Sequence, residues 1–302
     1  MLRSARMSGS EARFQTGLAT AIRPKYHAAP ETRRRTLMKI SIASYSFHGL
    51  RAQGMIDGFG YLETCRHRYR LDAADFWNGI LGPDELILDP SFQRKLTAAL
   101  REREMTVANY HVDGCHVWED DPGKRDHHHR SALEHLKFAA AIGARTVRID
   151  AGGTGKTWTN EQFDFIVRTF REYCRIADES GFRIGPESHW GPELVPDNME
   201  RLARAVDHRA FGILLHIGHW EDAPEEEGDR RLARWAVHTH VDARITRTRL
   251  MSAMKILLDA GYEGYWGVEH HSGKNEYAEV EYQLAEVRRA LSAIALEKET
   301  AR

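Results

Sequence analysis

The sequence predicts an α/β fold in a single domain: a closed barrel of eight parallel strands, each followed by a helix. Downstream of Met38 the chain alternates short β-like runs with amphipathic stretches, which is the pattern of a parallel sheet. Eight such units can be counted, and their strands start roughly 24 to 40 residues apart, enough for a strand, a loop and a crossover helix. An open doubly wound sheet usually has only about five to seven strands. Eight units therefore favour a (β/α)8 TIM barrel.

The predicted strands are short runs rich in apolar and β-branched residues. They are Lys39–Ser44, Ala73–Trp77, Thr106–His111, Thr146–Asp150, Arg183–Glu187, Gly212–His216, Ala236–Val241 and Gly264–Glu269. Several of them end in a histidine, an aspartate or a glutamate. Because the carboxyl ends of barrel strands meet at one face, where barrel enzymes carry their active sites, we expect these polar side chains to surround one mouth.

Helical spacing fills the segments between the strands. From Phe163 to Cys174 apolar residues recur three and four positions apart, Thr159 or Asn160 can cap the start, and Gly181 can end the helix. Similar patterns predict helices over Ser91–Arg103, Asp126–Ile142, Pro196–Asp207, Thr248–Ala260 and Tyr277–Leu296.

Residues 1–37 differ from the rest of the chain. They hold seven arginines and two glutamates and contain no apolar run of the signal-peptide type. Met38-Lys39-Ile40 reads like a natural protein start that runs directly into the first strand. We expect residues 1–37 to be a disordered leader or an over-extended start, with a targeting peptide as the alternative, and residues 38–302 to form the barrel.

Composition and charge narrow the classes of function. The 43 basic and 44 acidic residues leave a net charge of −1, which gives no reason to expect nucleic acid as a partner. No apolar run approaches the roughly 18 residues of a membrane span. Cys65, Cys115 and Cys174 lie far apart, which argues against a disulfide framework or a cysteine zinc site and fits a reducing compartment. We therefore expect a cytoplasmic protein without membrane contact.

Four potential metal ligands come from the fifth to eighth predicted strands. They are Glu187, His216, His240 and Glu269, and His238 is an alternative to His240 because positions two apart on a strand face the same way. Two carboxylates and two imidazoles suit manganese, cobalt, iron or zinc better than calcium. With four protein ligands, substrate can reach the ion only if the coordination expands to five or six. We therefore expect one divalent metal, manganese first, with cobalt, iron, zinc or magnesium as alternatives.

With these residues the chain resembles the xylose-isomerase-like sugar isomerases and epimerases, and the resemblance runs from Met38 to about Leu296. In that family the metal is held by a Glu after the fifth strand, an Asp after the sixth, a His on the seventh and a Glu after the eighth. The Asp position is His216 here. An imidazole in place of a carboxylate makes the site less negative by one charge, which should change its metal preference.

The resemblance implies a reaction and further site residues. Glu187 and Glu269 would exchange a proton with the substrate through a cis-enediolate, one removing it and the other returning it on the opposite face. His219 matches a substrate-contacting His three positions after the sixth-strand ligand, Glu193 matches a second acid six positions after the fifth-strand Glu, and Arg244 loosely matches an Arg after the seventh-strand His.

Other residues near the predicted strand ends are expected around the substrate. His111 and His270 belong to this set. The indole face of Trp190 suits the C–H face of a sugar ring, with packing in a long loop as the alternative. His189 could carry protons or support a ligand, or it is a loop histidine. Arg244 lies in a basic cluster that suits phosphate or carboxylate, with a solvated surface as the alternative.

Two polar runs are not assigned to the site. The run His127-His128-His129 falls near a predicted helix start, where three successive side chains point in different directions, so we expect it on the surface. The acidic run Glu225-Glu226-Glu227 is expected to be a solvated loop after the sixth strand.

The leading hypothesis is a divalent-metal-dependent sugar isomerase or epimerase with a small sugar as its substrate. A keto-sugar lyase or C-glycoside deglycosidase would use the same α-proton abstraction and is the first alternative. A non-catalytic barrel subunit is the second. An apurinic-site endonuclease looks like the same barrel but needs three metals and a basic face, which this sequence does not supply. A homo-oligomer is expected only by analogy with the family.

Overall fold

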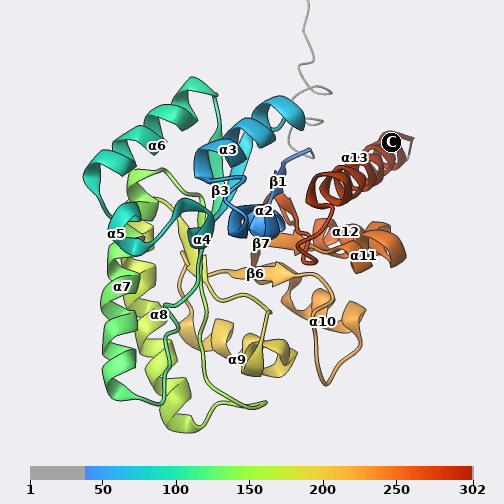
Figure 1. Cartoon of the computed structure of the whole chain (residues 1–302). Helices are drawn as coiled ribbons and strands as arrows, with labels where there is room; N and C mark the ends of the chain where they lie inside the picture. The colour runs from blue at the N-terminus through green and yellow to red at the C-terminus, as the bar shows by residue number, and fades with distance from the viewer. Residues whose placement is uncertain (1–37, 301–302) are drawn as a thin grey trace, which may run out of the picture.

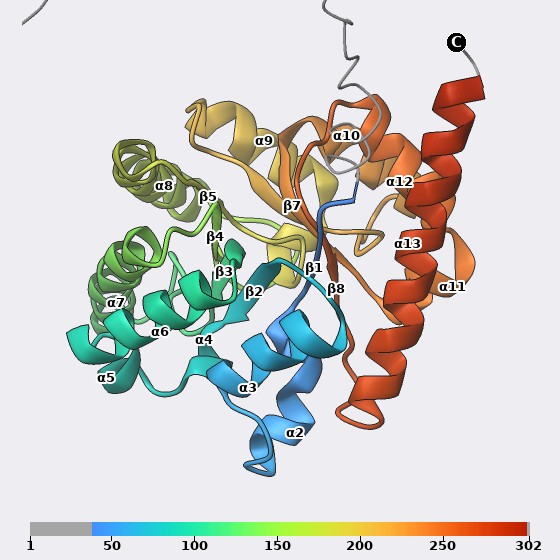
Figure 2. The same cartoon turned by 90° about the horizontal axis from the view of Figure 1, so that it is seen from above.

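The computed structural model describes residues 38–300, so the expectations for residues 1–37 lie outside the described residues. The predicted fold is confirmed: parallel strands alternate with helices, and the helices lie outside the ring of strands (Figure 1, Figure 2). The strands are β1 (Ile40–Ile42), β2 (Ala73–Trp77), β3 (Thr106–Val112), β4 (Thr146–Ile149), β5 (Arg183–Gly185), β6 (Ile213–His216), β7 (Ala236–Val241) and β8 (Trp266–Val268).

The barrel is assembled from two parallel four-stranded sheets, in the orders β1-β8-β7-β6 and β2-β3-β4-β5. Isolated bridges join the sheets at the two seams. Ala43 pairs with Asp75 between β1 and β2, and Glu187 pairs with Leu214 between β5 and β6. These seams place the ends of β5 and β6 next to each other, where two of the predicted ligands lie.

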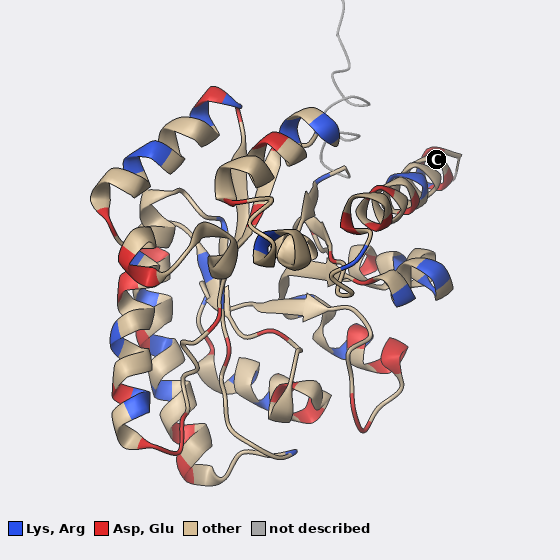
Figure 3. Ribbon diagram, in the orientation of Figure 1, with Lys and Arg blue, Asp and Glu red and all other residues tan. Residues whose placement is uncertain are grey.

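The helices that cover the strands are α2 (His48–Ala52), α3 (Gly58–Glu63), α4 (Asn78–Leu81), α5 (Asp84–Ile87), α6 (Pro90–Glu102), α7 (Pro122–Ala141), α8 (Asn160–Ser180), α9 (Pro196–Val206), α10 (Glu225–Leu232), α11 (Ala243–Thr248), α12 (Leu250–Asp259) and α13 (Glu276–Thr300). Both basic and acidic residues lie along the outer helices α6, α7 and α13 (Figure 3). Within residues 38–300 no helix combines the length and the apolar character that a membrane crossing requires.

Capping explains where several helices begin and end. Thr159 and Gln162 form a capping box at the start of α8, and Gly181 ends it in the left-handed conformation with φ 81°. Asp121 accepts a hydrogen bond from the Lys124 amide, and Pro122 occupies the first turn of α7. Because of this cap, α7 starts four residues earlier than the hydrophobic spacing predicts.

One expectation about local structure is wrong. The run Glu225–Glu227 is the first turn of α10 rather than a loop, since Pro224 precedes it and carboxylates are favourable at a helix N-terminus. The helix predicted over Thr248–Ala260 is present as α12, but it starts after Arg249, and Thr248 is the last residue of α11.

Candidate metal centre

Four predicted ligands come together at the carboxyl ends of neighbouring strands. His216 is the last residue of β6, His240 lies near the end of β7, Glu269 directly follows β8, and Glu187 lies two residues beyond β5. All four are buried, and one ligand atom from each lies within 4.8 Å of the others. The alternating direction of side chains along a strand turns all of them into the barrel mouth.

The two histidines present Nδ1 to the two carboxylates. Oε1 of Glu187 lies 3.0 Å from Nδ1 of His216 and 3.0 Å from Nδ1 of His240. Oε2 of Glu269 lies 3.3 Å from Nδ1 of His240 and 3.6 Å from Nδ1 of His216. Around an ion with bonds of about 2.1 Å, neighbouring ligands are separated by about 3.0 Å in octahedral and about 3.4 Å in tetrahedral geometry. The residues therefore fit a divalent metal.

Charge is distributed unequally over this group. Burial alone would raise the pKa of Glu187, but His240, His189 and Arg148 outweigh it and hold the pKa well below its usual value. Burial lowers the pKa of His216 to about 4, against the opposing effect of its hydrogen bond with Glu187. Burial would also lower the pKa of His240, yet Glu269 and Glu187 raise it well above its usual value.

Arg148 on β4 holds the other oxygen of Glu187, and the sequence interpretation missed it. The guanidinium is 3% exposed, and its Nε lies 3.0 Å from Oε2 of Glu187. Its Nη1 contacts Asp113 at 2.7 Å and Asp150 at 3.2 Å. The signal was available, because Arg148 is the one charged residue of β4, stands two positions before Asp150 and shares its face of the sheet.

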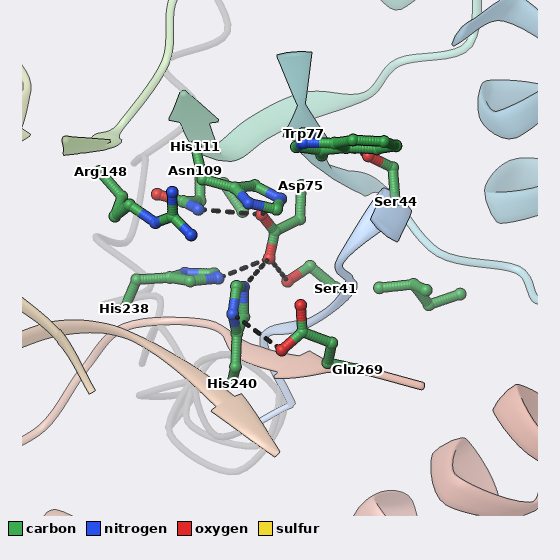
Figure 4. A network of polar contacts seen from close by, with 12 residues as sticks. Ser41, Ser44, Asp75, Trp77, Asn109, His111, Arg148, His238, His240 and Glu269 are labelled. Atoms are coloured by element: carbon green, nitrogen blue, oxygen red, sulfur yellow. Dashed lines mark hydrogen bonds and ion pairs between the residues drawn. The ribbon is translucent and has the colours of Figure 1, made fainter. Parts of the chain in front are cut away.

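Asp75 on β2 is the centre of a second polar group, which contacts the predicted ligand His240 (Figure 4). Its Oδ2 lies 2.6 Å from Nε2 of His238 and 3.4 Å from Nε2 of His240, and it accepts a hydrogen bond from Ser41 at 3.2 Å. Its Oδ1 accepts a hydrogen bond from Asn109 at 3.0 Å. Burial would raise the pKa of Asp75, but His238 and His240 lower it well below its usual value. His238 therefore belongs to this second polar group, and the geometry favours His240 as the ligand.

Two further histidines stand at the mouth beside the four ligands. His219, predicted from the family motif, stacks on His216 with ring centroids 3.7 Å apart, and its Nε2 lies 3.4 Å from Oδ2 of Asp242. His271 was not predicted. Its Nε2 lies 3.0 Å from Oε2 of Glu269, and its side chain is 39% exposed. Its position two residues after Glu269 is the sequence signal that could have identified it.

Three predicted substrate-binding residues lie close to this group. The half-exposed His189 has its Nδ1 3.9 Å from Oε2 of Glu187. The indole of Trp190 donates a hydrogen bond to Asp150 at 3.1 Å. His111 is buried in the second polar group, with its ring 5.4 Å from that of His240, so its contacts are with the ligands rather than with the open mouth.

Three other predicted substrate-binding residues have different partners. Glu193 is fully buried and accepts a hydrogen bond from the Ala151 amide. Arg244 pairs with Glu225 and donates a hydrogen bond to the Gly218 carbonyl at 3.2 Å. His270 turns into its own loop, where its Nε2 lies 2.9 Å from Oγ of Ser272. A substrate role for these three stays a prediction.

The sequence of residues 57–293 matches the family model described as xylose isomerase-like TIM barrel. The chain belongs to the xylose isomerase-like TIM barrel family. No curated protein matches the sequence significantly. The family assignment therefore rests on the match to the model, and it agrees with the fold described above.

Several solved structures have a fold similar to that of this chain. A D-tagatose 3-epimerase-like protein is 17% identical with a TM-score of 0.67, and the match covers 86% of this chain and 99% of that one. The probable 3-DHS dehydratase AsbF of Bacillus anthracis is 13% identical with a TM-score of 0.63, covering 82% and 98%. A Mycobacterium smegmatis protein in complex with magnesium is 15% identical with a TM-score of 0.64, covering 84% and 98%. At these identities the likeness concerns the fold.

Proposed function

We propose that the protein is a divalent-metal-dependent sugar isomerase or epimerase. The observation that carries this proposal is the buried group of Glu187, His216, His240 and Glu269 at the barrel mouth. A metal held by these four residues would make the proton next to a substrate carbonyl acidic enough for a carboxylate to remove. Manganese is the first expectation, and cobalt, iron, zinc and magnesium are alternatives. The fold shared with a D-tagatose 3-epimerase-like protein supports a sugar as substrate.

The two carboxylates are not equivalent as proton acceptors. Oε2 of Glu269 faces His240 and His271, and no arginine or lysine in the described part of the chain forms an ion pair with Glu269. Both oxygens of Glu187 are engaged, Oε1 by the histidines and Oε2 by Arg148. We assign proton removal to Glu269, and Glu187, after taking up a proton from solvent, would return it on the opposite face of the enediolate. His219, stacked on His216, would orient a substrate oxygen.

A keto-sugar lyase or C-glycoside deglycosidase is the second candidate, and Arg148 favours it. The guanidinium opposes protonation of Glu187, which an epimerase with two carboxylates needs for proton return. A lyase needs only one carboxylate to take the proton while a leaving group departs. The shared fold with a probable 3-DHS dehydratase is compatible with such an elimination.

The substrate is expected to enter between the loops that carry His189, Trp190 and His271. His189 and His271 are exposed at 43% and 39%, so they can meet a ligand from solvent. We also propose that residues 38–302 act as one catalytic domain in the cytoplasm. The buried free thiols of Cys65, Cys115 and Cys174 support a reducing compartment. A homo-oligomer remains part of the proposal by analogy with the family.

Solvent proton exchange tests this function. Manganese-loaded protein is incubated with a panel of ketoses and keto-glycosides in D2O, and NMR follows both the α-proton and the product. An epimerase incorporates deuterium and forms a new sugar, whereas a lyase releases the leaving group. Glu269→Gln should abolish exchange, and Glu227→Gln, a change at an exposed residue of α10, should leave it intact. Exchange that survives in Glu269→Gln would contradict the assignment of the base.

A further inference from the structure

Three side chains outside the candidate metal centre converge at the edge of the mouth. His116 and Glu119 come from the loop after β3, and His128 comes from the second turn of α7. One ligand atom from each lies within 4.8 Å of the other two. Nδ1 of His116 is 3.0 Å from Oε1 of Glu119, and Nδ1 of His128 is 3.8 Å from the same oxygen. These separations bracket the roughly 3.4 Å between ligands in a tetrahedral site with bonds of about 2.1 Å.

The backbone that carries this cluster is fixed on both sides. The Val117 amide donates to the Asp150 carbonyl at 2.9 Å, and the Trp118 amide donates to the Ala151 carbonyl at 2.8 Å. Asp121 caps α7 through the Lys124 amide. The loop and the helix therefore hold their side chains in place without help from the cluster itself.

Only one histidine of the His127–His129 run faces the loop. His127 is exposed, and Nδ1 of His129 lies 3.0 Å from Oη of Tyr173 on α8. His128 turns toward Glu119, with a side chain that is 16% exposed. The expectation that the three histidines diverge is thus confirmed, but His128 meets partners that come from the preceding loop.

His128 has an unsatisfied polar atom. Its Nδ1 is buried and has no hydrogen-bond partner in the described part of the chain. The 3.8 Å to Glu119 is too long for a hydrogen bond. A buried ring nitrogen without a partner is unfavourable, and a ligand between the two rings and the carboxylate would satisfy it.

We propose that His116, Glu119 and His128 form a second divalent metal site of the zinc type, separate from the four-residue centre. Two imidazoles and one carboxylate suit zinc and leave at least one position for water. An ion there would tie the loop after β3 to α7. The His116 ring also lies 4.6 Å from Trp190, whose indole donates to Asp150, so the site would fix a tryptophan at the mouth.

Zinc titration by calorimetry tests this site on metal-free full-length protein. The variants are His128→Ala for the proposed site, Glu269→Gln for the four-residue centre, and His127→Ala as a matched control on the same helix. We expect wild type and His127→Ala to bind about two zinc ions per chain, and His128→Ala to lose one of them. Glu269→Gln should keep the binding that depends on His128. Unchanged zinc binding in His128→Ala would overturn the proposal.

A second readout separates this site from the proposed function. In the Glu269→Gln background, Co²⁺ bound by His116, Glu119 and His128 should quench the fluorescence of Trp190. This fluorescence is measured as the difference between the protein with Trp190 and the same protein with Trp190→Phe. Adding the conservative change Glu119→Gln should remove this quenching while circular dichroism remains that of folded protein. Quenching that persists with Glu119→Gln would overturn the site whatever the activity of the enzyme. Quenching that depends on Glu119 would support it even if no sugar were a substrate.

Discussion

Nε2 of His238 lies 2.6 Å from Oδ2 of Asp75, and this buried pair joins β7 to β2 across the barrel. The same carboxylate oxygen lies 3.4 Å from Nε2 of His240, whose other nitrogen faces Glu187. A carboxylate behind a histidine fixes the tautomer and the orientation of the ring. This placement predicts that Asp75 helps to orient the ring of His240, which presents Nδ1 to the mouth.

Asp75→Asn should weaken both the fold and the metal site. The change keeps the size of the side chain but removes the charge that His238 and His240 face. We expect a loss of about 3 kcal/mol in the free energy of unfolding, measured with urea. Manganese affinity should fall by about 10- to 100-fold in calorimetry. Asp72→Asn, at an exposed residue just before the same strand, is the control. Unaltered manganese affinity in a folded Asp75→Asn protein would contradict the positioning role.

Arg148→Met should destabilise the protein more than Arg148→Lys. The methionine leaves Glu187 and Asp150 buried without their cation, and breaking a buried pair in this way costs about 3–5 kcal/mol. Lysine retains the charge but cannot reproduce the forked contacts to three carboxylates. Chemical unfolding of the two variants beside wild type checks the order. Equal stability of all three would mean that the ion pairs contribute nothing.

His216→Asp should change which metal the centre prefers. The substitution adds one negative charge and an oxygen ligand at the sixth-strand position, as in the family pattern. We expect the ratio of zinc to magnesium affinity to fall by about tenfold, measured by competition between the two ions. His219→Ala, which removes the ring stacked on His216 but no proposed ligand, serves as the control. A ratio that does not change would argue against His216 as a ligand.

Glu193→Gln should make stability less dependent on pH. Burial and Asp150 raise the pKa of Glu193 well above its usual value, so the folded protein binds this proton more tightly than the unfolded chain. The contribution of the wild-type acid is complete below the unfolded pKa of about 4.3 and is lost as pH rises through the folded pKa. The stability of Glu193→Gln relative to wild type should therefore increase with pH, by up to about 1.4 kcal/mol per unit.

Thermal unfolding of the two proteins between pH 5 and pH 8 measures this difference, and Glu227→Gln is the exposed control. The decisive result is whether the stability of Glu193→Gln relative to wild type increases with pH. A relative stability of Glu193→Gln that does not change between pH 5 and pH 8 would mean that the buried carboxyl is ionised in the folded protein.

The barrel and the four clustered ligands were predictable because each signal is local. A polar residue at the end of an apolar strand is visible in a window of a few residues, and parallel strands bring such ends together. Asp75 and the partners of Arg148 were not found because their contacts come from distant parts of the chain. Asp75 and His238 are 163 positions apart. Their pairing depends on closure of the barrel, which no local sequence pattern predicts.

The sequence also did not predict the directions in which the loop side chains point. His270 was expected at the mouth because it follows Glu269, yet the neighbour that reaches Glu269 is His271. The side chains of successive residues point to opposite sides of a strand, so a shift of one position decides which histidine reaches Glu269. Glu193 has the spacing of the family motif, but the loop that carries it folds back against Ala151.

Elemental analysis tests the central claim, that Glu187, His216, His240 and Glu269 hold a divalent metal. Wild type, His216→Ala and Glu269→Ala are purified without chelator, reconstituted with manganese and analysed beside Glu227→Ala. All four proteins, including the reference called wild type here, carry the additional change His128→Ala, so that only metal at the four-residue centre is counted. We predict about one manganese per chain in wild type and in Glu227→Ala, and its loss in the other two. A reconstituted wild type without metal, or metal retained by both His216→Ala and Glu269→Ala, would contradict the claim.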